Sequence, residues 1–81
     1  MKPLHKLPSG EKAYIVDIGN PLFCEKFFDL GIFPGDLVEV KENSLNSNSL
    51  IVCVNKKVFN IYKRMAETII TNVVSFEINL N

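Results

Sequence analysis

Apolar and polar positions alternate with a period of two over several short stretches of the chain, the pattern of β-strands that bury one face. The first such stretch predicts a strand over residues 12–18. On this strand, Ala13 and Ile15 share one face, and Val16 and Ile18 share the opposite face. One face of the strand is therefore expected to line a core.

Three further strands are predicted after it, at residues 36–42, 50–54 and 57–62. In the first of them Val38 and Val40 point the same way, whereas the second is a continuous apolar run. The second and third are joined by Asn55 and Lys56, which suit a tight two-residue hairpin turn. A polar loop rich in Asn and Ser, residues 43–49, precedes this hairpin.

The C-terminal part of the chain predicts one more strand. Residues 63–67 are too few for a full helix and predict a single helical turn, after which a last strand starts near Thr68. Residues 72–81 keep the alternation, so they either extend this strand or add another. The apolar positions of this segment are Val74, Phe76, Ile78 and Leu80.

A short helix is predicted between the first two strands. Asn20 is a good N-cap, Pro21 suits the first helical position, and Gly31 suits the left-handed residue just past the helix end. With Gly31 in that position, Ile32 is expected to pack against Phe27, as in a Schellman ending. The helix thus has a start signal and a stop signal.

Two further turns follow from proline and glycine. Pro34 and Gly35 fit the second and third positions of a type II turn, in which the third residue has positive φ. Pro8 and Gly10 indicate another turn before the first strand. Gly10, Gly31, Pro34 and Gly35 are therefore interpreted as structural turn residues.

Together these elements predict a mainly β fold. Five or six short strands with one short helix after the first strand favour a small barrel, closed or nearly closed. The length of 81 residues allows one domain, residues 1–81, with residues 72–81 as a C-terminal strand extension.

The charge and composition of the chain argue against two classes of partner, nucleic acid and membrane. Nine basic and nine acidic residues cancel, so the chain has no long-range positive field that favours nucleic acid. Its apolar runs are far shorter than the roughly 20 residues that span a bilayer, and its start lacks the apolar segment of a signal peptide. Cys24 and Cys53 are expected to be small buried thiols.

Three segments of the chain resemble the ferrous iron transport protein A (FeoA) family. They read LPSGEKAYIVDI, FFDLGIFPGDLVEV and VFNIYKRMAETIIT. The most specific part is residues 30–35, which match the leucine-glycine-aliphatic-x-proline-glycine signature of that family. The resemblance covers roughly residues 4–71. In the helix before the signature, where many members carry arginine, this chain has Cys24, Glu25 and Lys26.

The resemblance implies an SH3-like β-barrel with a helix inserted after the first strand. It also implies a non-enzymatic, cytoplasmic accessory role in bacterial ferrous iron uptake, exerted by contact with the membrane transporter and GTPase FeoB. From this resemblance we expect a cytoplasmic protein that its partner recruits to the inner face of the membrane and that does not insert into the bilayer itself.

The residues themselves do not predict catalysis or a cofactor. His5 is the only histidine and is expected to be solvated beside a flexible N-terminus, so at most a weak contact with Fe²⁺ or another divalent metal is expected. No nucleophile has a recognisable base at a suitable spacing, and the glycines do not form a phosphate loop. We therefore expect no enzyme activity.

The aromatic residues around the helix suggest a binding surface instead. Phe23 and Leu30 lie on the stripe expected to face the barrel, and Phe28 lies about 100° around the helix from it. A short helix cannot easily bury all its aromatics. We hypothesise that four residues form or support the contact with the transporter: Phe27, Phe28, Leu30 and Phe33.

Three alternatives remain at this point. One is a regulatory or metal-responsive domain related to the C-terminal domain of diphtheria-toxin-repressor-type metalloregulators. Another is a peptide-binding SH3 module, for which the aromatic residues are poorly placed. The third is a homo-oligomer formed through residues 72–81, because an alternating strand can pair with the sheet edge of a second copy.

Overall fold

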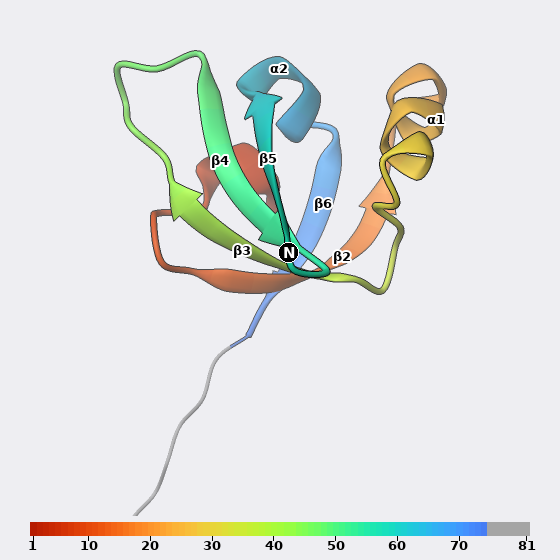
Figure 1. Ribbon diagram of the computed structural model, residues 1–81, viewed down its shortest axis with the longest axis horizontal. Coiled ribbons are helices and arrows are strands. Elements are labelled where there is room, and N and C mark those ends of the chain that lie inside the picture. Colours follow the sequence, from red (N-terminus) through yellow and green to blue (C-terminus); the bar gives the residue numbers. More distant parts are fainter. Residues whose placement is uncertain (75–81) are drawn as a thin grey trace, which may run out of the picture.

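The computed structural model describes residues 1–74, which form one curled antiparallel sheet with three short helical segments (Figure 1). The strands are β1 (Lys2–Pro3), β2 (Lys12–Ile18), β3 (Leu37–Glu42), β4 (Ser49–Val54), β5 (Lys57–Tyr62) and β6 (Ile69–Val73). The helical segments are the 3₁₀ turn η1 (Leu4–Lys6), helix α1 (Pro21–Asp29) and the single turn α2 (Lys63–Ala66). The mainly β fold predicted from the sequence is confirmed.

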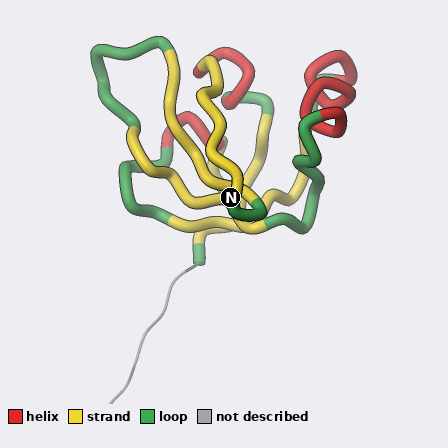
Figure 2. The backbone as a smooth tube through the Cα atoms, in the orientation of Figure 1, coloured by secondary structure: helices red, strands yellow, loops and turns green. Residues whose placement is uncertain are grey.

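The sheet is an open barrel. Its strand order is β1-β6-β2-β3-β4-β5, so the end strands β1 and β5 are not paired with each other. The single turn α2 directly follows β5 and contacts η1, which directly follows β1, so the two ends of the sheet are linked through these helical segments (Figure 2). The barrel is therefore open between β1 and β5, and no ladder of hydrogen bonds joins these two strands.

An irregularity in β2 changes which residues face the core. The pairing of β2 with β6 shifts between Ile15 and Asp17, which marks a bulge. Ala13 and Ile15 are buried as predicted, but Ile18 is buried too, while Asp17 is exposed. The prediction that Ile18 lies on the opposite face from Ile15 is wrong, because the bulge reverses the alternation within the strand.

Strand β3 follows the predicted alternation, whereas β4 alternates in burial although its sequence is a continuous apolar run. Val38 and Val40 of β3 are fully buried. The apolar run of β4 has only one fully buried face, made by Leu50, Val52 and Val54, with half-buried residues between them. The hairpin turn at residues 55–56 and the helical turn after β5 are present as predicted.

The N-terminus is part of the barrel, contrary to the prediction of a flexible segment. Leu4 and Leu7 are fully buried, and β1 pairs with β6. The side chain of Asn43 donates to the main-chain oxygens of His5 and Leu7, at 3.0 and 2.7 Å. His5 is half-buried, and its Nδ1 is buried with no hydrogen-bond partner within residues 1–74. The prediction of a solvated His5 is therefore wrong.

Only part of the predicted C-terminal extension falls in the described region. Residues 72 and 73 belong to β6, and the main-chain N–H of Val74 donates to the oxygen of Lys12 at 2.9 Å. Residues 75–81 lie outside the described residues, so their pairing stays a prediction, as does the single domain over residues 1–81.

We expect Leu7→Ala to lower the free energy of unfolding by about 2–5 kcal/mol, because it leaves a cavity in the core beneath the N-terminal segment. Leu45→Ala is the matched control, since Leu45 is fully exposed and its loss should cost less than about 0.5 kcal/mol. Urea denaturation of both variants measures the difference. Equal stabilities would show that the N-terminal segment does not contribute to the core.

Candidate functional site

Helix α1 starts at the residue that the sequence predicted. The side-chain Oδ1 of Asn20 accepts hydrogen bonds from the main-chain N–H groups of Leu22, at 2.9 Å, and Phe23, at 3.2 Å. Pro21, in the first turn, has no N–H to satisfy. The N-cap therefore fixes where the helix leaves β2.

The end of α1 is a Schellman motif, also as predicted. Gly31 has φ of +83°, and its N–H donates to the oxygen of Phe28 at 2.9 Å. The N–H of Ile32 donates to the oxygen of Phe27, also at 2.9 Å. Phe27 and Ile32 are both buried in the core, so this ending anchors the helix to the barrel.

The next turn is closed by two hydrogen bonds of its own. The N–H of Asp36 donates to the oxygen of Phe33 at 3.1 Å, and Gly35 has φ of +96°, as a type II turn requires. The Asp36 carboxylate also accepts a hydrogen bond, at 2.9 Å, from the main-chain N–H of Phe33. The position of the Phe33 main chain is thereby fixed.

Two other segments hold this turn. The N–H of Gly35 donates to the oxygen of Ile15 at 2.7 Å, and the N–H of Ile15 donates to the oxygen of Asp36 at 2.9 Å. From the β4–β5 hairpin, the Asn55 side chain donates to the Asp36 carboxylate at 3.3 Å. The sequence predicted Asn55 as a turn residue but gave no sign of this long-range contact, which depends on the sheet's curl.

These turns present three apolar side chains to solvent, which we call the α1 corner: Phe28, Leu30 and Phe33. They are 40%, 48% and 44% exposed. The rings of Phe28 and Phe33 are stacked, with centroids 4.8 Å apart. Leu22, at the start of the same helix, is a further exposed apolar residue that the sequence analysis did not single out.

Some predicted roles around the α1 corner change. Leu30 was expected to face the barrel, but it is the C-cap and lies where the chain leaves the helix, so it is exposed. Phe23 is half-buried against the core. Phe27 is fully buried and cannot touch a partner directly, so among the four hypothesised contact residues it can only support the other three.

No grouping of three or more potential metal ligands (His, Cys, Asp or Glu) occurs within residues 1–74. Cys24 and Cys53 are free and only half-buried, which corrects the expectation of buried thiols.

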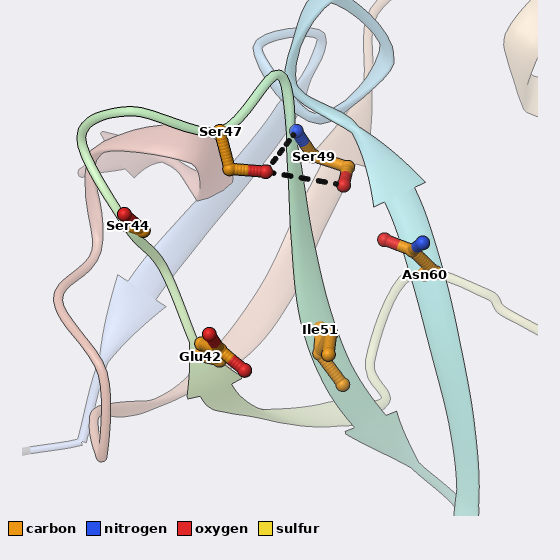
Figure 3. A pocket seen from close by; sticks show the side chains of 6 residues that line it. All are labelled: Glu42, Ser44, Ser47, Ser49, Ile51 and Asn60. Atoms are coloured by element: carbon orange, nitrogen blue, oxygen red, sulfur yellow. Dashed lines mark hydrogen bonds between the residues drawn. The ribbon is translucent and has the colours of Figure 1, made fainter.

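A polar hollow of about 100 Å³ lies under the β3–β4 loop (Figure 3). It is lined by Glu42, Ser44, Ser47, Ser49, Ile51 and Asn60. Ser47 Oγ accepts from the main-chain N–H of Ser49 at 3.2 Å and lies 3.4 Å from its Oγ. These contacts are those of a loop that satisfies its own polar groups. Glu42 is the one potential base among the six residues, and the serine hydrogen bonds in this hollow do not involve it.

None of the helices in the described residues is long and apolar enough to cross a membrane.

The protein is a small SH3-like barrel with an exposed apolar corner. The family model described as FeoA domain matches residues 2–72, and the chain belongs to the FeoA family. The family and fold inferred from the sequence are thereby confirmed. A comparison with curated proteins finds no match.

Solved structures agree with this assignment. A crystal structure of an iron uptake regulatory protein (FeoA) is similar with 26% identity and a TM-score of 0.78, over 90% of this chain and 96% of that one. FeoA from Chlorobium tepidum is similar with 21% identity and a TM-score of 0.83, over 99% and 76% of the chains. A manganese-dependent transcriptional repressor shares the fold alone, with 13% identity and a TM-score of 0.81 over 90% of this chain and 41% of that one.

We expect Gly31→Ala to destabilise the protein by about 1–2 kcal/mol, because a side chain disfavours the positive φ of this residue although no atom lies in its way. Gly19→Ala is the control: Gly19 lacks a positive φ, and an added Cβ would make ordinary contact with the oxygen of Thr68 at 3.6 Å. Thermal or urea denaturation compares the two. A Gly31→Ala variant as stable as Gly19→Ala would contradict the role given to the Schellman ending.

Proposed function

We propose that this protein is a non-enzymatic accessory protein of ferrous iron uptake that acts by contact with the transporter FeoB. Its membership of the FeoA family connects it with ferrous iron transport. The observation that supports a contact function is the α1 corner, where Phe28, Leu30 and Phe33 are exposed on a main chain held by hydrogen bonds at several points.

The rigidity of the α1 corner favours binding. Aromatic residues dominate binding energy at protein interfaces when they are packed and desolvated by the partner. The Schellman ending and the type II turn already fix the main chain on both sides of Leu30 and Phe33, and Phe28 stacks on Phe33. Little conformational entropy is therefore lost when a partner covers the corner.

Chemistry, in this proposal, belongs to the partner. GTP is hydrolysed by the GTPase domain of FeoB, and the small protein contributes a surface that recognises one state of it. The site of action is the cytoplasmic face of the membrane, to which the transporter recruits the accessory protein. Iron is the cargo of the transporter, and a tight metal site on the accessory protein is not required for this role.

The likeness to the metal-dependent repressors does not favour the alternative of a metal-responsive regulatory domain. It concerns the fold alone, at 13% identity in the manganese-dependent repressor. Within residues 1–74 no cluster of candidate ligands supports a metal-triggered response. The contact function therefore has the better support.

Titration of the protein into detergent-solubilised FeoB from the same organism, followed by calorimetry with and without nucleotide and Fe²⁺, tests the proposal. We expect Phe28→Asp and Phe33→Asp each to weaken binding about tenfold or more, because a charge would be desolvated at the centre of an apolar contact. Circular dichroism checks that both variants are folded.

Leu45→Asp is the matched control, since it adds the same charge at an exposed apolar residue of the β3–β4 loop, outside the α1 corner. It should bind as the unmodified protein does. Folded Phe28→Asp and Phe33→Asp variants with unchanged affinity would exclude the α1 corner as the contact, and absence of binding in every nucleotide state would contradict the proposed function itself.

A further inference from the structure

Strand β5 has a free edge. It is the last strand in the sheet order and pairs only with β4 (Figures 1 and 2). No other strand within residues 1–74 lies against its outer side. An unpaired edge presents main-chain donors and acceptors that can pair with another strand.

The register of the hairpin shows which groups face outward. Asn55 and Lys56 both have positive φ, as in a two-residue type I′ turn, and Val54 lies opposite Lys57. The pair beside such a turn is hydrogen-bonded, and hydrogen-bonded pairs then alternate along the ladder. Phe59 is therefore bonded to β4.

The alternate residues direct their main chain to solvent. Val58 and Asn60 point both N–H and C=O away from β4, and so does the N–H of Tyr62. The C=O of Tyr62 is engaged by α2, because Tyr62 is the N-cap of that helical turn. Five main-chain groups along β5 are thus available to an added strand.

The side chains beside these groups are apolar and exposed. Val58 and Tyr62 are each 66% exposed, with the exposed Asn60 between them. An incoming strand with apolar residues at matching positions can pack against Val58 and Tyr62 while its main chain pairs with the edge.

Positive charge flanks the edge at both ends. Lys56 and Lys57 lie at the hairpin, and Lys63 and Arg64 follow Tyr62. A hollow of about 280 Å³, lined by Asn48, Tyr62, Lys63 and Arg64, continues from the end of β5. Residues 55–66 contain no acidic side chain. The two ends of β5 are therefore positively charged, whereas Glu42 lines the hollow beside Asn60 at its middle.

This charge pattern decides the kind of occupant. Antiparallel pairing of β5 with β5 of a second copy would set the basic ends of the two copies beside each other, and facing like charges are destabilising. If the added strand instead carries carboxylates at its ends, these are attracted by the basic residues at both ends of β5. The edge therefore suits an acidic strand of a different protein better than a second copy of this chain.

We propose that the outer edge of β5 binds, by strand addition, an extended segment of another protein in which alternating apolar residues lie between acidic ends. This mode of recognition takes affinity from main-chain pairing and selectivity from side-chain pockets and flanking charge. The surface is separate from the α1 corner and does not depend on the function proposed for it.

The probe is a synthetic peptide of about nine residues, with two glutamates at each end and alternating valine and threonine between them. Amide hydrogen exchange measured by NMR should show new protection at Val58, Asn60 and Tyr62. The amides of Phe59 and Ile61, already paired with β4, should be unchanged. Only the addition of a strand predicts this alternation.

Asn60→Pro should weaken peptide binding about tenfold or more, because it removes an outward N–H and obstructs the approaching strand. The fold should tolerate it, since the N–H of Asn60 is not used in the ladder with β4. Asn60→Thr is the matched control: it changes the side chain, keeps the N–H, and should bind within about twofold of the unmodified protein.

Lys57→Glu tests the charge without altering the main chain. It should weaken binding several-fold, and the difference should shrink in about 0.5 M NaCl. Lys26→Glu, an equal charge change at an exposed residue of α1, should have no effect. Phe28→Asp should also leave peptide binding unchanged, so this test is independent of any result with FeoB.

Two outcomes would overturn the proposal. One is the absence of protection at Val58, Asn60 and Tyr62 when the peptide is present at millimolar concentration. The other is the same alternating protection in protein alone as its concentration rises, which would make a second copy the occupant.

Discussion

Burial of one face of a single curled sheet is the interaction on which the rest of this structure depends. The strands are short, and within residues 1–74 no second sheet covers them, so the sheet must curl until its own inner face encloses the core. The bulges in β2 and β3 permit this curl, because each bends its strand and increases the local twist. The ends of the sheet stay unpaired, and Leu4 of η1 and Ala66 of α2 are buried in the core that the sheet encloses.

The same curl explains why the chain between α1 and β3 is fixed so firmly. The loop must leave a helix, reverse direction twice and return to the sheet beside β2. Backbone positions with positive φ at Gly31 and Gly35 make both reversals feasible, and bonds to Ile15 and Asn55 hold the result against the barrel. Phe27 and Ile32 are drawn into the core, and Phe28 and Phe33 are left outside.

Two different kinds of surface result from these constraints. At the α1 corner the main chain is satisfied and the apolar side chains are free, which favours contact with a shaped partner surface. At the outer edge of β5 the main-chain N–H and C=O groups have no strand to pair with, so hydrogen bonding by the main chain matters more there than side-chain contact. Such an edge favours an extended partner. Both surfaces exist because a small barrel cannot bury all of its apolar side chains and main-chain polar groups.

The sequence by itself determined the local elements. Alternation, N-cap and turn residues specify the strands, α1, its Schellman ending and the type II turn, because each depends on side chains and φ preferences within a few residues. The resemblance at residues 30–35 also led to the family. The tertiary structure decided the rest: the burial of Ile18, the place of the N-terminal leucines, the contact from Asn55, and the exposure of Leu30. These depend on a bulge, on the sheet's curl and on contacts between distant segments, none of which a period-two or helical pattern encodes.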